Sequence, residues 1–483
     1  MGRLADAQPS AHGGGLGRHG EELAILSGRD QCRLDRHRRR ARLHRLPAPR
    51  HEMAGRAAGA HFLPPGLRRT RQHEGDGHRH MTQTCDVVVA GGGPAGLAAA
   101  TLIAGDGARV VLLGADENAA TNDPRTIALM QPSIRLLAHL GLWPGQLRDH
   151  SCPLRRLRMV DDTGSALPAP TLTFDPGELG EEVFGWNIPL AHLVPALATA
   201  ARAAGVTFLA TNADAARAGD GAIVVTAGDT KIKAKLAIAA DGRASLLRQA
   251  AGIACSRWSY DQTALATSFA HSGDHEGIST EYHRRAGPFT TVPLPGRRSA
   301  LVWMETPERA AELMVMADAD LAREIQLASH GNLGRIDGIG PRKLFAMEGL
   351  TAKSYAARRT LLIGEAAHVV PPIGAQGLNM SLRDAAQAAE LIEGEKDAGS
   401  PGLLLRYDAL RRSDVLPREQ IIHMMNRSLL GGFAAADAAR SLGFELLGAI
   451  APLRRFVMRR GLGPVANLPR SMRPKRQEAV AAG

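Results

Sequence analysis

The sequence is poor in cysteine and in long apolar runs, and each shortage excludes a class of protein. Its 483 residues include four cysteines and no Cys-x-x-Cys pair, which excludes a disulfide framework and a four-cysteine metal site. No run of eighteen or more apolar residues is present, so no membrane-spanning helix is expected. The start of the chain also lacks the apolar stretch of a secretory signal. We expect a cytoplasmic protein without a metal site.

Lysine is absent from residues 1–80, which hold sixteen arginines, nine histidines and eight acidic residues. This segment carries +8 of the net charge of +11, so the rest is nearly neutral and nucleic acid is not an expected partner. With little hydrophobic periodicity, the segment cannot bury enough apolar surface to offset its ordering entropy. We expect a disordered or non-native extension from a start codon placed too early. The alternatives are a transit peptide and an RNA- or membrane-binding arm.

From Met81 onward the pattern is that of a nucleotide-binding α/β protein. Residues 86–90 (DVVVA) are typical of a buried parallel strand, and a glycine-rich turn leads into an Ala-rich helical stretch and a second strand at 108–113. Glycines in this pattern allow the tight turn, the approach of the backbone to a pyrophosphate and close helix packing. Three glycines therefore predict a dinucleotide at the helix N-terminus: Gly91, Gly93 and Gly96.

The acidic residue that usually holds the adenosine ribose is missing from this pattern. Its position, at the end of the second strand, falls on Gly114. Asp116 and Glu117 follow closely and are the candidates to replace it, with water as the alternative.

Two later strands also end in glycine-containing turns. Residues 234–240 lead into Asp241-Gly242, and residues 360–363 lead into Gly364-Glu365-Ala366-Ala367-His368 and the loop 371–379 (PPIGAQGLN). With these motifs the sequence resembles the flavoprotein monooxygenases of the para-hydroxybenzoate-hydroxylase type, and within them the branch that hydroxylates ubiquinone precursors. The resemblance covers Asp86 to about Gly461 and includes three further segments: 123–126 (DPRT), 260–264 (YDQTA) and 425–428 (MNRS).

The resemblance implies an α/β fold: a Rossmann-type FAD-binding domain with an antiparallel substrate sheet and a C-terminal helical region. The FAD-binding domain would comprise residues 81–255 and 346–395. The substrate-binding sheet would lie between them, at residues 256–345, and the helical region would be residues 396–483.

The resemblance also implies residue roles. Arg125 is expected beside the FAD pyrophosphate. Asp241-Gly242 is expected near the pyrophosphate and near the docking NAD(P)H. Glu365 is expected at the ribityl or pyrophosphate region, and Asn379 is expected to anchor the isoalloxazine. Amides of the loop 371–379 would stabilise the anionic reduced flavin. The expected cofactor-binding set is Gly91, Gly93, Gly96, Arg125, Asp241, Gly242, Gly364, Glu365, Pro371, Gly374, Gln376, Gly377 and Asn379.

Two positions depart from the family pattern. Glu365 stands where Asp is more common, which keeps the acceptor but moves it by one methylene. Gly374-Ala375 reverses the usual Ala-Gly order, and because alanine adopts a positive φ only at a cost, we expect the loop to differ slightly.

Other residues have a functional and a structural interpretation. His368 is a weak candidate for proton transfer, since a histidine in such a turn more often satisfies backbone groups or packs. Arg383 and Asp384 are expected simply to start the helix after the loop. Three residues of the substrate sheet either face the flavin ring or pack in the core: Phe289, Pro293 and Trp303. The sequence contains no GxSxG nucleophile elbow.

The implied reaction uses NADH or NADPH, O₂ and FAD to hydroxylate a prenylated phenol, and the cofactor supplies the difficult chemistry. The alternatives are a hydroxylase of another aromatic substrate, an isoprenoid-reducing flavoprotein on the same fold, and a binding protein that acts through its arginine-rich arm. Apolar residues between 429 and 453, followed by arginines, suit peripheral attachment to the inner membrane. Packing on the catalytic domain and a contact within a biosynthetic complex are the alternatives for this region.

Overall fold

The computed structural model describes residues 81–114, 123–165, 168–430, 434–461 and 468–474, and the side chains of 428–440, 460 and 461 are not among those described. Residues 1–80, Asp116 and Glu117 lie outside the described residues, so what the sequence predicts for them stays a prediction.

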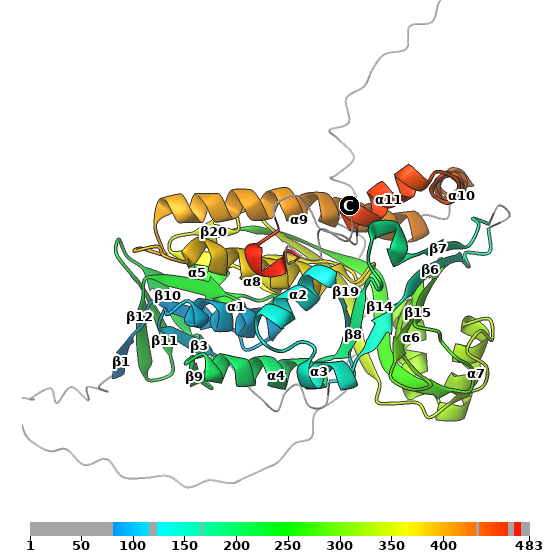
Figure 1. The fold of residues 1–483 in the computed structure, drawn as a ribbon, viewed down its shortest axis with the longest axis horizontal. Helices are drawn as coiled ribbons and strands as arrows, with labels where there is room; N and C mark the ends of the chain where they lie inside the picture. Colours follow the sequence, from blue (N-terminus) through cyan, green and yellow to red (C-terminus); the bar gives the residue numbers. More distant parts are fainter. Residues whose placement is uncertain (1–80, 115–122, 166–167, 431–433, 462–467, 475–483) are drawn as a thin grey trace, which may run out of the picture. The chain divides into compact units, whose positions relative to one another are not determined.

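A six-stranded sheet forms the centre of the nucleotide-binding part (Figure 1). Every residue of β2 (Val87–Ala90), β3 (Val110–Leu113) and β13 (Leu236–Ala239) is buried, so both faces of the sheet are covered, as parallel strands require. The strand order is β20 (Ala356–Ala357), β21 (Thr360–Leu362), β13, β2, β3, β9 (Thr207–Leu209), and only β20 runs antiparallel to its neighbour.

Helices and a second sheet pack against these strands. The helix α1 (Pro94–Gly105) lies on β2 and β3 and contacts both α4 (Leu190–Ala203) and α8 (Gln376–Ile392). A four-stranded sheet and the short helix α5 (Leu246–Ala250) also pack here, through apolar residues such as Val225 and Ile232. The order of this sheet is β1 (Met81–Thr84), β12 (Thr230–Ala234), β11 (Ile223–Ala227), β10 (Ala215–Ala218).

A nine-stranded, mostly antiparallel sheet forms the second part of the molecule, and one of its pairs, β15 with β6, is parallel. It draws strands from before and after residues 256–345, so the substrate sheet extends beyond the segment that the sequence marks out. Its strands are β6 (Arg156–Asp161), β7 (Leu172–Phe174), β14 (Cys255–His271), β15 (Ile278–Arg284), β16 (Gly287–Leu294), β17 (Arg298–Glu305), β18 (Ile336–Asp337), β19 (Lys343–Ala352) and β22 (His368–Val369).

The helices α6 (Pro307–Val315) and α7 (Asp318–Ala328) cover one face of this sheet. Phe289 and Trp303 belong to that covered face: they are buried, meet edge to face at 5.0 Å and share a cluster with residues of both helices. Of the two interpretations that the sequence allows for them, core packing is the one observed.

A three-stranded sheet joins the two parts and consists of β4 (Thr126–Met130), β8 (Gly185–Pro189) and β5 (Cys152–Leu154). Two helices follow its first strand, α2 (Gln131–His139) and α3 (Gly145–Asp149). Asn187 in the central strand donates from Nδ2 to the carbonyl of Pro293 in the large sheet at 3.1 Å. This contact ties the small sheet to the substrate sheet.

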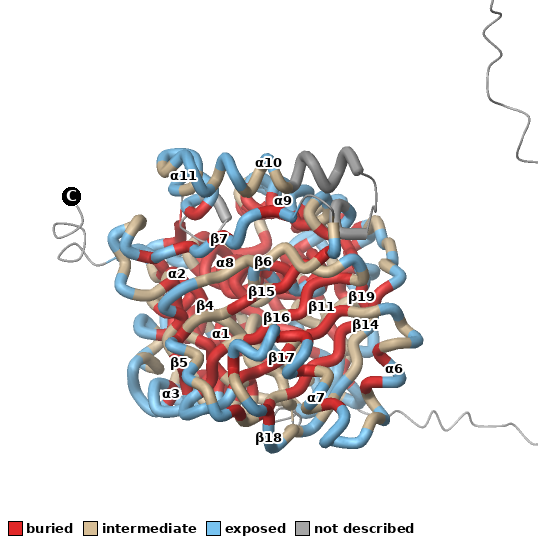
Figure 2. Tube along the Cα trace, turned by 90° about the vertical axis from the view of Figure 1, so that its right-hand side faces the viewer, coloured by how far each residue is buried: buried red, intermediate tan, exposed pale blue. Residues whose placement is uncertain are grey.

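Three α-helices follow, α9 (Pro401–Leu430), α10 (Ala434–Ala449) and α11 (Ala451–Gly461), and the last described segment contains the short 3-10 helix Arg470–Met472. In Figure 2 the strands are mostly buried, whereas α11 and the coloured part of α10 are mainly exposed at the periphery. No helix among the described residues is both long enough and apolar enough to cross a bilayer. The predicted fold class is confirmed, and the exact domain boundaries stay a prediction.

Gly185 in β8 lies against the backbone of β4, and its own Cβ would fall 1.9 Å from the carbonyl oxygen of Leu129. We expect Gly185→Ala to lower the free energy of unfolding by about 1–3 kcal/mol, because backbone must move to relieve the overlap. The matched control is Gly221→Ala, whose added methyl meets no atom within 4 Å. Urea denaturation of both variants tests this, and equal midpoints would contradict it.

Candidate active site

The turn between β2 and α1 contains three glycines, two of which lie so close to other backbone atoms that a side chain would not fit. Gly91 has a φ of +117°, and a Cβ on it would lie 2.1 Å from the carbonyl oxygen of Ala240, at the end of β13. A Cβ on Gly96 would lie 2.0 Å from the carbonyl oxygen of Gly91. A Cβ on Gly93 would meet nothing within 4 Å, so the turn is open on that side. The two crowded glycines keep α1 close to the strand ends, and the third leaves room in front of the helix.

The N-terminus of α1 supplies free amide donors at this open side. Gly93 is its N-cap, no side chain caps the helix, and Pro94 occupies the first turn. The first amides of a helix have no partner within it and carry a partial positive charge. The residues present therefore fit the pyrophosphate of a dinucleotide, which such an N-terminus binds.

A cavity of about 360 Å³ lies at the carboxyl ends of the parallel strands. The register aligns Ala90 with Leu113 and with Ala239, which brings the three strand ends to one edge of the sheet. Asp241 lies here with Oδ2 accepting from the amides of Leu246 and Leu247, while its buried Oδ1 has no partner among the described residues. The cavity is lined by Ala90, Gly91, Leu113, Asn212, Ala213, Ala240, Asp241, Ala244 and Leu246.

Asn212 is a site residue that sequence reasoning missed. It lines the cavity next to Gly114, where a Cβ would lie 2.3 Å from Oδ1 of Asn212. Gly114 is the position where an acidic residue is usual, so a polar side chain from another segment occupies that place. The sequence signal that could have identified Asn212 is its position: it is a polar residue shortly after β9, and β9 is the sheet neighbour of β3.

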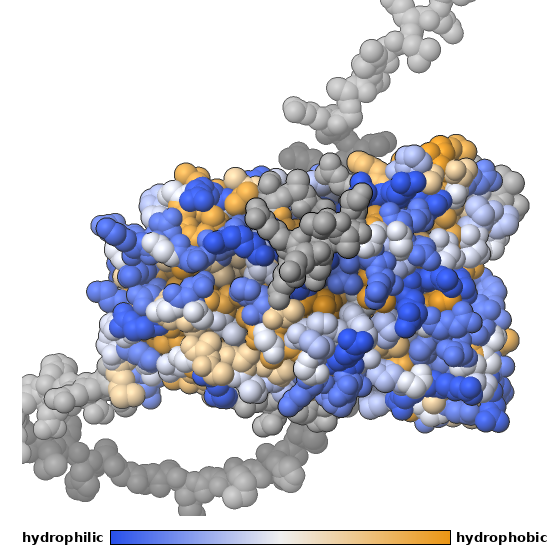
Figure 3. Space-filling view, in the orientation of Figure 1, coloured by the Kyte–Doolittle hydropathy of each residue, from blue (hydrophilic) through white to orange (hydrophobic). Residues whose placement is uncertain are grey.

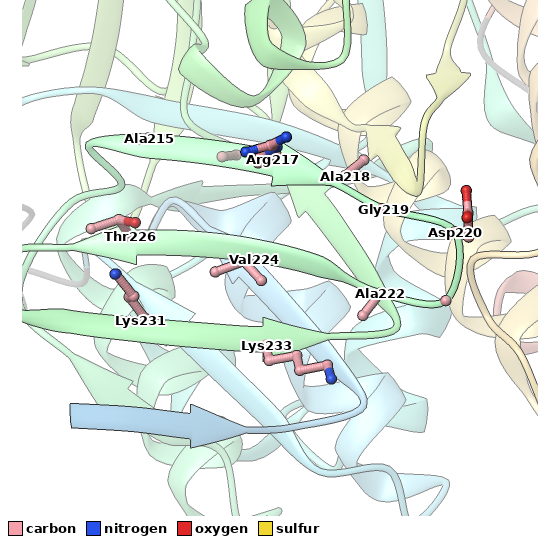
Figure 4. Close-up of a pocket in the computed structure, with 12 residues that line it drawn as sticks. Ala215, Arg217, Ala218, Gly219, Asp220, Ala222, Val224, Thr226, Lys231 and Lys233 are labelled. Carbon is pink, nitrogen blue, oxygen red and sulfur yellow. The ribbon is translucent and has the colours of Figure 1, made fainter. Parts of the chain in front are cut away.

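A larger open groove of about 710 Å³ lies over the four-stranded sheet (Figure 4). Its walls are mainly small and basic side chains of β10, β11 and β12, such as Val224, Thr226 and Lys231. None of the predicted site residues lines this groove, so it is separate from the candidate active site.

The loop after β21 leads into the N-terminus of α8. Pro371 and Gln376 are buried, while Gly374 and Gly377 are exposed. Gly374 and Ala375 both have positive φ, +62° and +53°. The alanine thus adopts the left-handed conformation that its side chain disfavours, at a cost of roughly 1–2 kcal/mol. Strain of this kind persists where the surroundings impose it, and α8 begins here without a side-chain cap.

Asn379 holds this loop to the rest of the protein. Its Oδ1 accepts from the amide of Met130 and the hydroxyl of Ser133, and its Nδ2 donates to the carbonyls of Ala128 and Ala375. These four hydrogen bonds use the capacity of the amide group. The side chain therefore positions the loop rather than presenting free donors to a ligand.

Arg125 and Glu365 both have protein partners. Arg125 forms a two-pronged ion pair with Asp123, with its closest contact at 2.6 Å, and its guanidinium lies 5.0 Å from the centre of the Phe345 ring in β19. Glu365 is half exposed, in the short helix Gly364–Ala366, and accepts from Nε of Arg243 at 3.1 Å. Neither residue lines the cavity at the strand ends.

A buried ionic network lies behind the loop, and Asp384 is its centre. His368 donates from Nε2 to Oδ2 of Asp384 at 2.6 Å, and Nε of Arg411 donates to Oδ1 at 2.7 Å. The amide of Gly364 donates to the same carboxylate at 2.9 Å. Asp384 is thus not merely a helix-starting residue: it ties the end of β21 to α8 and α9.

The network continues through Asp414 in α9. This carboxylate accepts from Arg411, from Arg383 at 2.7 Å and from Arg418 at 3.1 Å, and Arg418 in turn donates to Oε1 of Gln376 at 3.3 Å. The three α9 residues are spaced i, i+3 and i+7, so they share one helix face, and this charge pattern was the sequence signal for the network.

The pKa shifts follow from burial and opposite charge. Burial alone would raise the pKa of Asp384, but the charges of His368 and Arg411 outweigh it and hold that pKa below its usual range. Burial likewise acts to lower the pKa of His368, and the Asp384 carboxylate outweighs it and raises that pKa. His368 is therefore held as a cation in a buried ion pair, an arrangement that fits a structural role.

Two motifs distant in the sequence meet where β14 is irregular, between Ser259 and Thr263. The hydroxyl of Tyr260 and Nδ1 of His423 are 2.7 Å apart, and Nδ2 of Asn426 donates to Oε1 of Gln262 at 2.9 Å. The segments 260–264 and 425–428 thus hold α9 against the substrate sheet. Among the described residues, no group of three or more His, Cys, Asp or Glu is arranged to hold a metal ion.

Glu419, next to the network, provides a test of these electrostatics. Its Oε2 accepts from Thr351 at 2.8 Å, and burial raises its pKa from 4.5 to about 7. The folded state therefore holds this proton more tightly than the unfolded state, so the contribution of Glu419 to stability is fully present below pH 4.5 and is lost as the pH rises through 7. Glutamine mimics the protonated form and does not titrate. The free energy of unfolding of Glu419→Gln minus that of wild type should therefore rise by roughly 2–4 kcal/mol between pH 4.5 and pH 7.

Urea denaturation at a series of pH values measures this difference. Glu395→Gln, at an exposed position, is the matched control and should follow the wild-type profile. Parallel profiles for wild type and Glu419→Gln would show that burial of this carboxyl does not affect folding.

The family model described as an FAD binding domain matches residues 84–416. The ubiquinone hydroxylase UbiL of Rhodospirillum rubrum is 33% identical over 392 residues, which cover 79% of this chain and 90% of the relative. The 3-demethoxyubiquinol 3-hydroxylase of Escherichia coli is 27% identical, over 79% of this chain and 99% of its own length.

Among solved structures, p-nitrophenol 4-monooxygenase PnpA of Pseudomonas putida has a TM-score of 0.64 at 20% identity and covers 80% of this chain and all of its own. At that identity the likeness concerns the fold alone. The extent of the family match and the 33% identity show more: the chain belongs to the FAD binding domain family and is an FAD-dependent monooxygenase of the aromatic-ring hydroxylase type.

Proposed function

We propose that this monooxygenase hydroxylates the aromatic ring of a prenylated phenol in ubiquinone biosynthesis, with NADH or NADPH as electron donor and O₂ as oxygen source. The observation that carries the proposal is the similarity over most of the chain to two enzymes whose names specify ubiquinone or ubiquinol hydroxylation. An apolar cluster beside the loop 371–379 supports an apolar substrate.

The dinucleotide half of FAD would occupy the cavity at the strand ends. The free amides at the start of α1 would bind the pyrophosphate, with Gly91, Gly93 and Gly96 providing the space. Asn212 would take the place of the missing acidic residue at the adenosine ribose. Asp241 and Gly242 would face the cofactor from β13, since the Oδ1 of Asp241 has no protein partner.

The flavin ring would lie against the loop between Pro371 and Asn379. Exposed backbone at Gly374 and Gly377 would donate hydrogen bonds to the ring, and the uncapped N-terminus of α8 would stabilise negative charge on it. Pro371 and Gln376 would hold the loop from its buried side. Gly364 and Glu365 would flank the ribityl chain of the cofactor. Arg125 would lie at the pyrophosphate. FAD supplies the electron and oxygen chemistry, and the protein supplies position and charge.

The substrate would bind between this loop and the substrate sheet. Ala375 of the loop and Val292 of β16 belong to one apolar cluster, which also contains Met130, Leu154 and Phe174. Apolar walls exclude water from the reacting atoms, which oxygen transfer to a ring requires. Because the cofactor carries the reaction, a side-chain nucleophile is not needed, and His368 would act by positioning the loop.

Cofactor binding is tested by Gly91→Ala. Its methyl would overlap the backbone carbonyl of Ala240, at a φ that alanine disfavours, so the turn that faces the pyrophosphate must distort. We expect the purified variant to bind FAD at least tenfold more weakly, measured by absorbance and by flavin fluorescence titration. Gly105→Ala, at the far end of the helix that follows this turn, has no atom of the described residues within 4 Å of its added methyl and should keep full flavin content. Normal flavin binding by Gly91→Ala would overturn the assignment of this turn.

The reaction is tested with the full-length flavoprotein, a short-chain prenylated phenol, NAD(P)H and ¹⁸O₂. Mass spectrometry should show one ¹⁸O atom in the ring of the product. Oxygen incorporation only into an unprenylated phenol would assign another aromatic substrate. Reduction of the prenyl double bonds without ¹⁸O would assign an isoprenoid reductase instead and refute the proposal.

A further inference from the structure

The outward face of the last two helices is apolar. Half of the exposed large apolar side chains of the described residues lie within residues 442–457. We use the term C-terminal apolar face for five of them, which are between 36% and 56% exposed: Leu442, Leu446, Ile450, Leu453 and Val457. Apolar atoms gather at this end of the molecule, over α10, in Figure 3. Concentrations of this kind on a protein surface mark interaction sites.

Helical spacing aligns these side chains. Leu442 and Leu446 are four residues apart on α10, Leu453 and Val457 are four apart on α11, and Ile450 lies at the junction between the two helices. Each helix therefore presents an aligned pair of apolar side chains, rather than scattered residues, to the surroundings.

The opposite sides of both helices are anchored to the protein body. Phe444, Leu447 and Met458 pack into the same apolar cluster as Ala375 of the flavin loop. Arg454 donates to Glu178 at 2.8 Å and to the carbonyls of Leu447 and Gly448, which fixes the turn between the helices. The C-terminal apolar face is thus held outward, and its helices pack directly on the proposed substrate region.

The helix that carries Leu453 and Val457 is positively charged, and its exposed arginines Arg455 and Arg459 lie on its polar side, about half a turn around the helix from these two residues. The sequence of α11 has four arginines and no acidic residue, and Arg455 and Arg459 are exposed. Glu445 is the only acidic side chain described in α10 and α11. A two-fold contact through this face would bring two copies of the basic helix α11 together with little compensation from acidic side chains. An anionic lipid surface supplies both the apolar layer and the negative charge that this face matches.

We propose that the C-terminal apolar face binds the surface of an anionic lipid bilayer, with Leu446 and Leu453 inserted among the lipids, while Arg455 and Arg459 on the polar side of α11 attract the protein to the negatively charged headgroups. A helix of eleven residues is about 16 Å long, about half the hydrocarbon thickness, so α11 would lie on the membrane. The proposal adds a partner to the proposed function. It rests on residues outside the flavin site, so the two can fail separately.

The test is co-sedimentation of the full-length flavoprotein with lipid vesicles. Wild type should bind vesicles of phosphatidylcholine mixed with phosphatidylglycerol more strongly than vesicles of phosphatidylcholine alone. Leu446→Ser with Leu453→Ser should reduce partitioning at least tenfold. Arg455→Gln with Arg459→Gln should reduce it about fivefold for each arginine removed. The matched control is Val315→Ser with Leu327→Ser, two exposed apolar residues of α6 and α7, which should bind as wild type does.

Three results would overturn this proposal. Wild type could fail to bind the anionic vesicles, the leucine variant could bind as wild type does, or ultracentrifugation could reveal a dimer that the leucine variant dissociates. Flavin absorbance of each variant confirms that it is folded. A leucine variant that keeps its flavin and loses vesicle binding supports the lipid surface, whatever the outcome of the ¹⁸O₂ experiment.

Discussion

The buried carboxylate of Asp384 is the interaction on which the candidate site depends. A charge at this depth is stable only with opposite charges and donors around it, and His368, Arg411 and the amide of Gly364 provide them. These partners come from β22, α9 and the end of β21. One ionised group thus fixes the relative positions of the strand end, the loop and the long helix, and the loop can then keep Ala375 in a disfavoured conformation.

Close backbone approach is the second constraint. Gly91 and Gly96 bring the start of α1 against the ends of β2 and β13, and Gly91 itself lines the cavity at the strand ends. Asp241, just after β13, and Asn212, just after β9, line the same cavity. The cavity at the strand ends is therefore formed by rigid elements, while the loop 371–379, where we propose that the flavin ring lies, is held from behind by ion pairs.

The proposed substrate region connects this site with the end of the chain. Ala375, Val292 and Met458 belong to one apolar cluster, so the loop, the substrate sheet and α11 share a core. The other side of the substrate sheet packs on α6 and α7 through Phe289 and Trp303. The sheet therefore separates the core beneath α6 and α7 from the side that faces the loop 371–379.

The sequence by itself was sufficient for the family, the fold class and the turn at Gly91, because short apolar strands and glycine spacing are local properties of the chain. Tertiary structure decided which groups meet. Asn212 lies beside Gly114, and Asp384 pairs with Arg411, only because the fold brings together strands and helices that are far apart in the sequence. It also decided that Phe289 and Trp303 pack in the core, since alternation along a strand shows that two faces differ but not what covers each. Burial and partner choice depend on the whole fold, and local pattern cannot specify them.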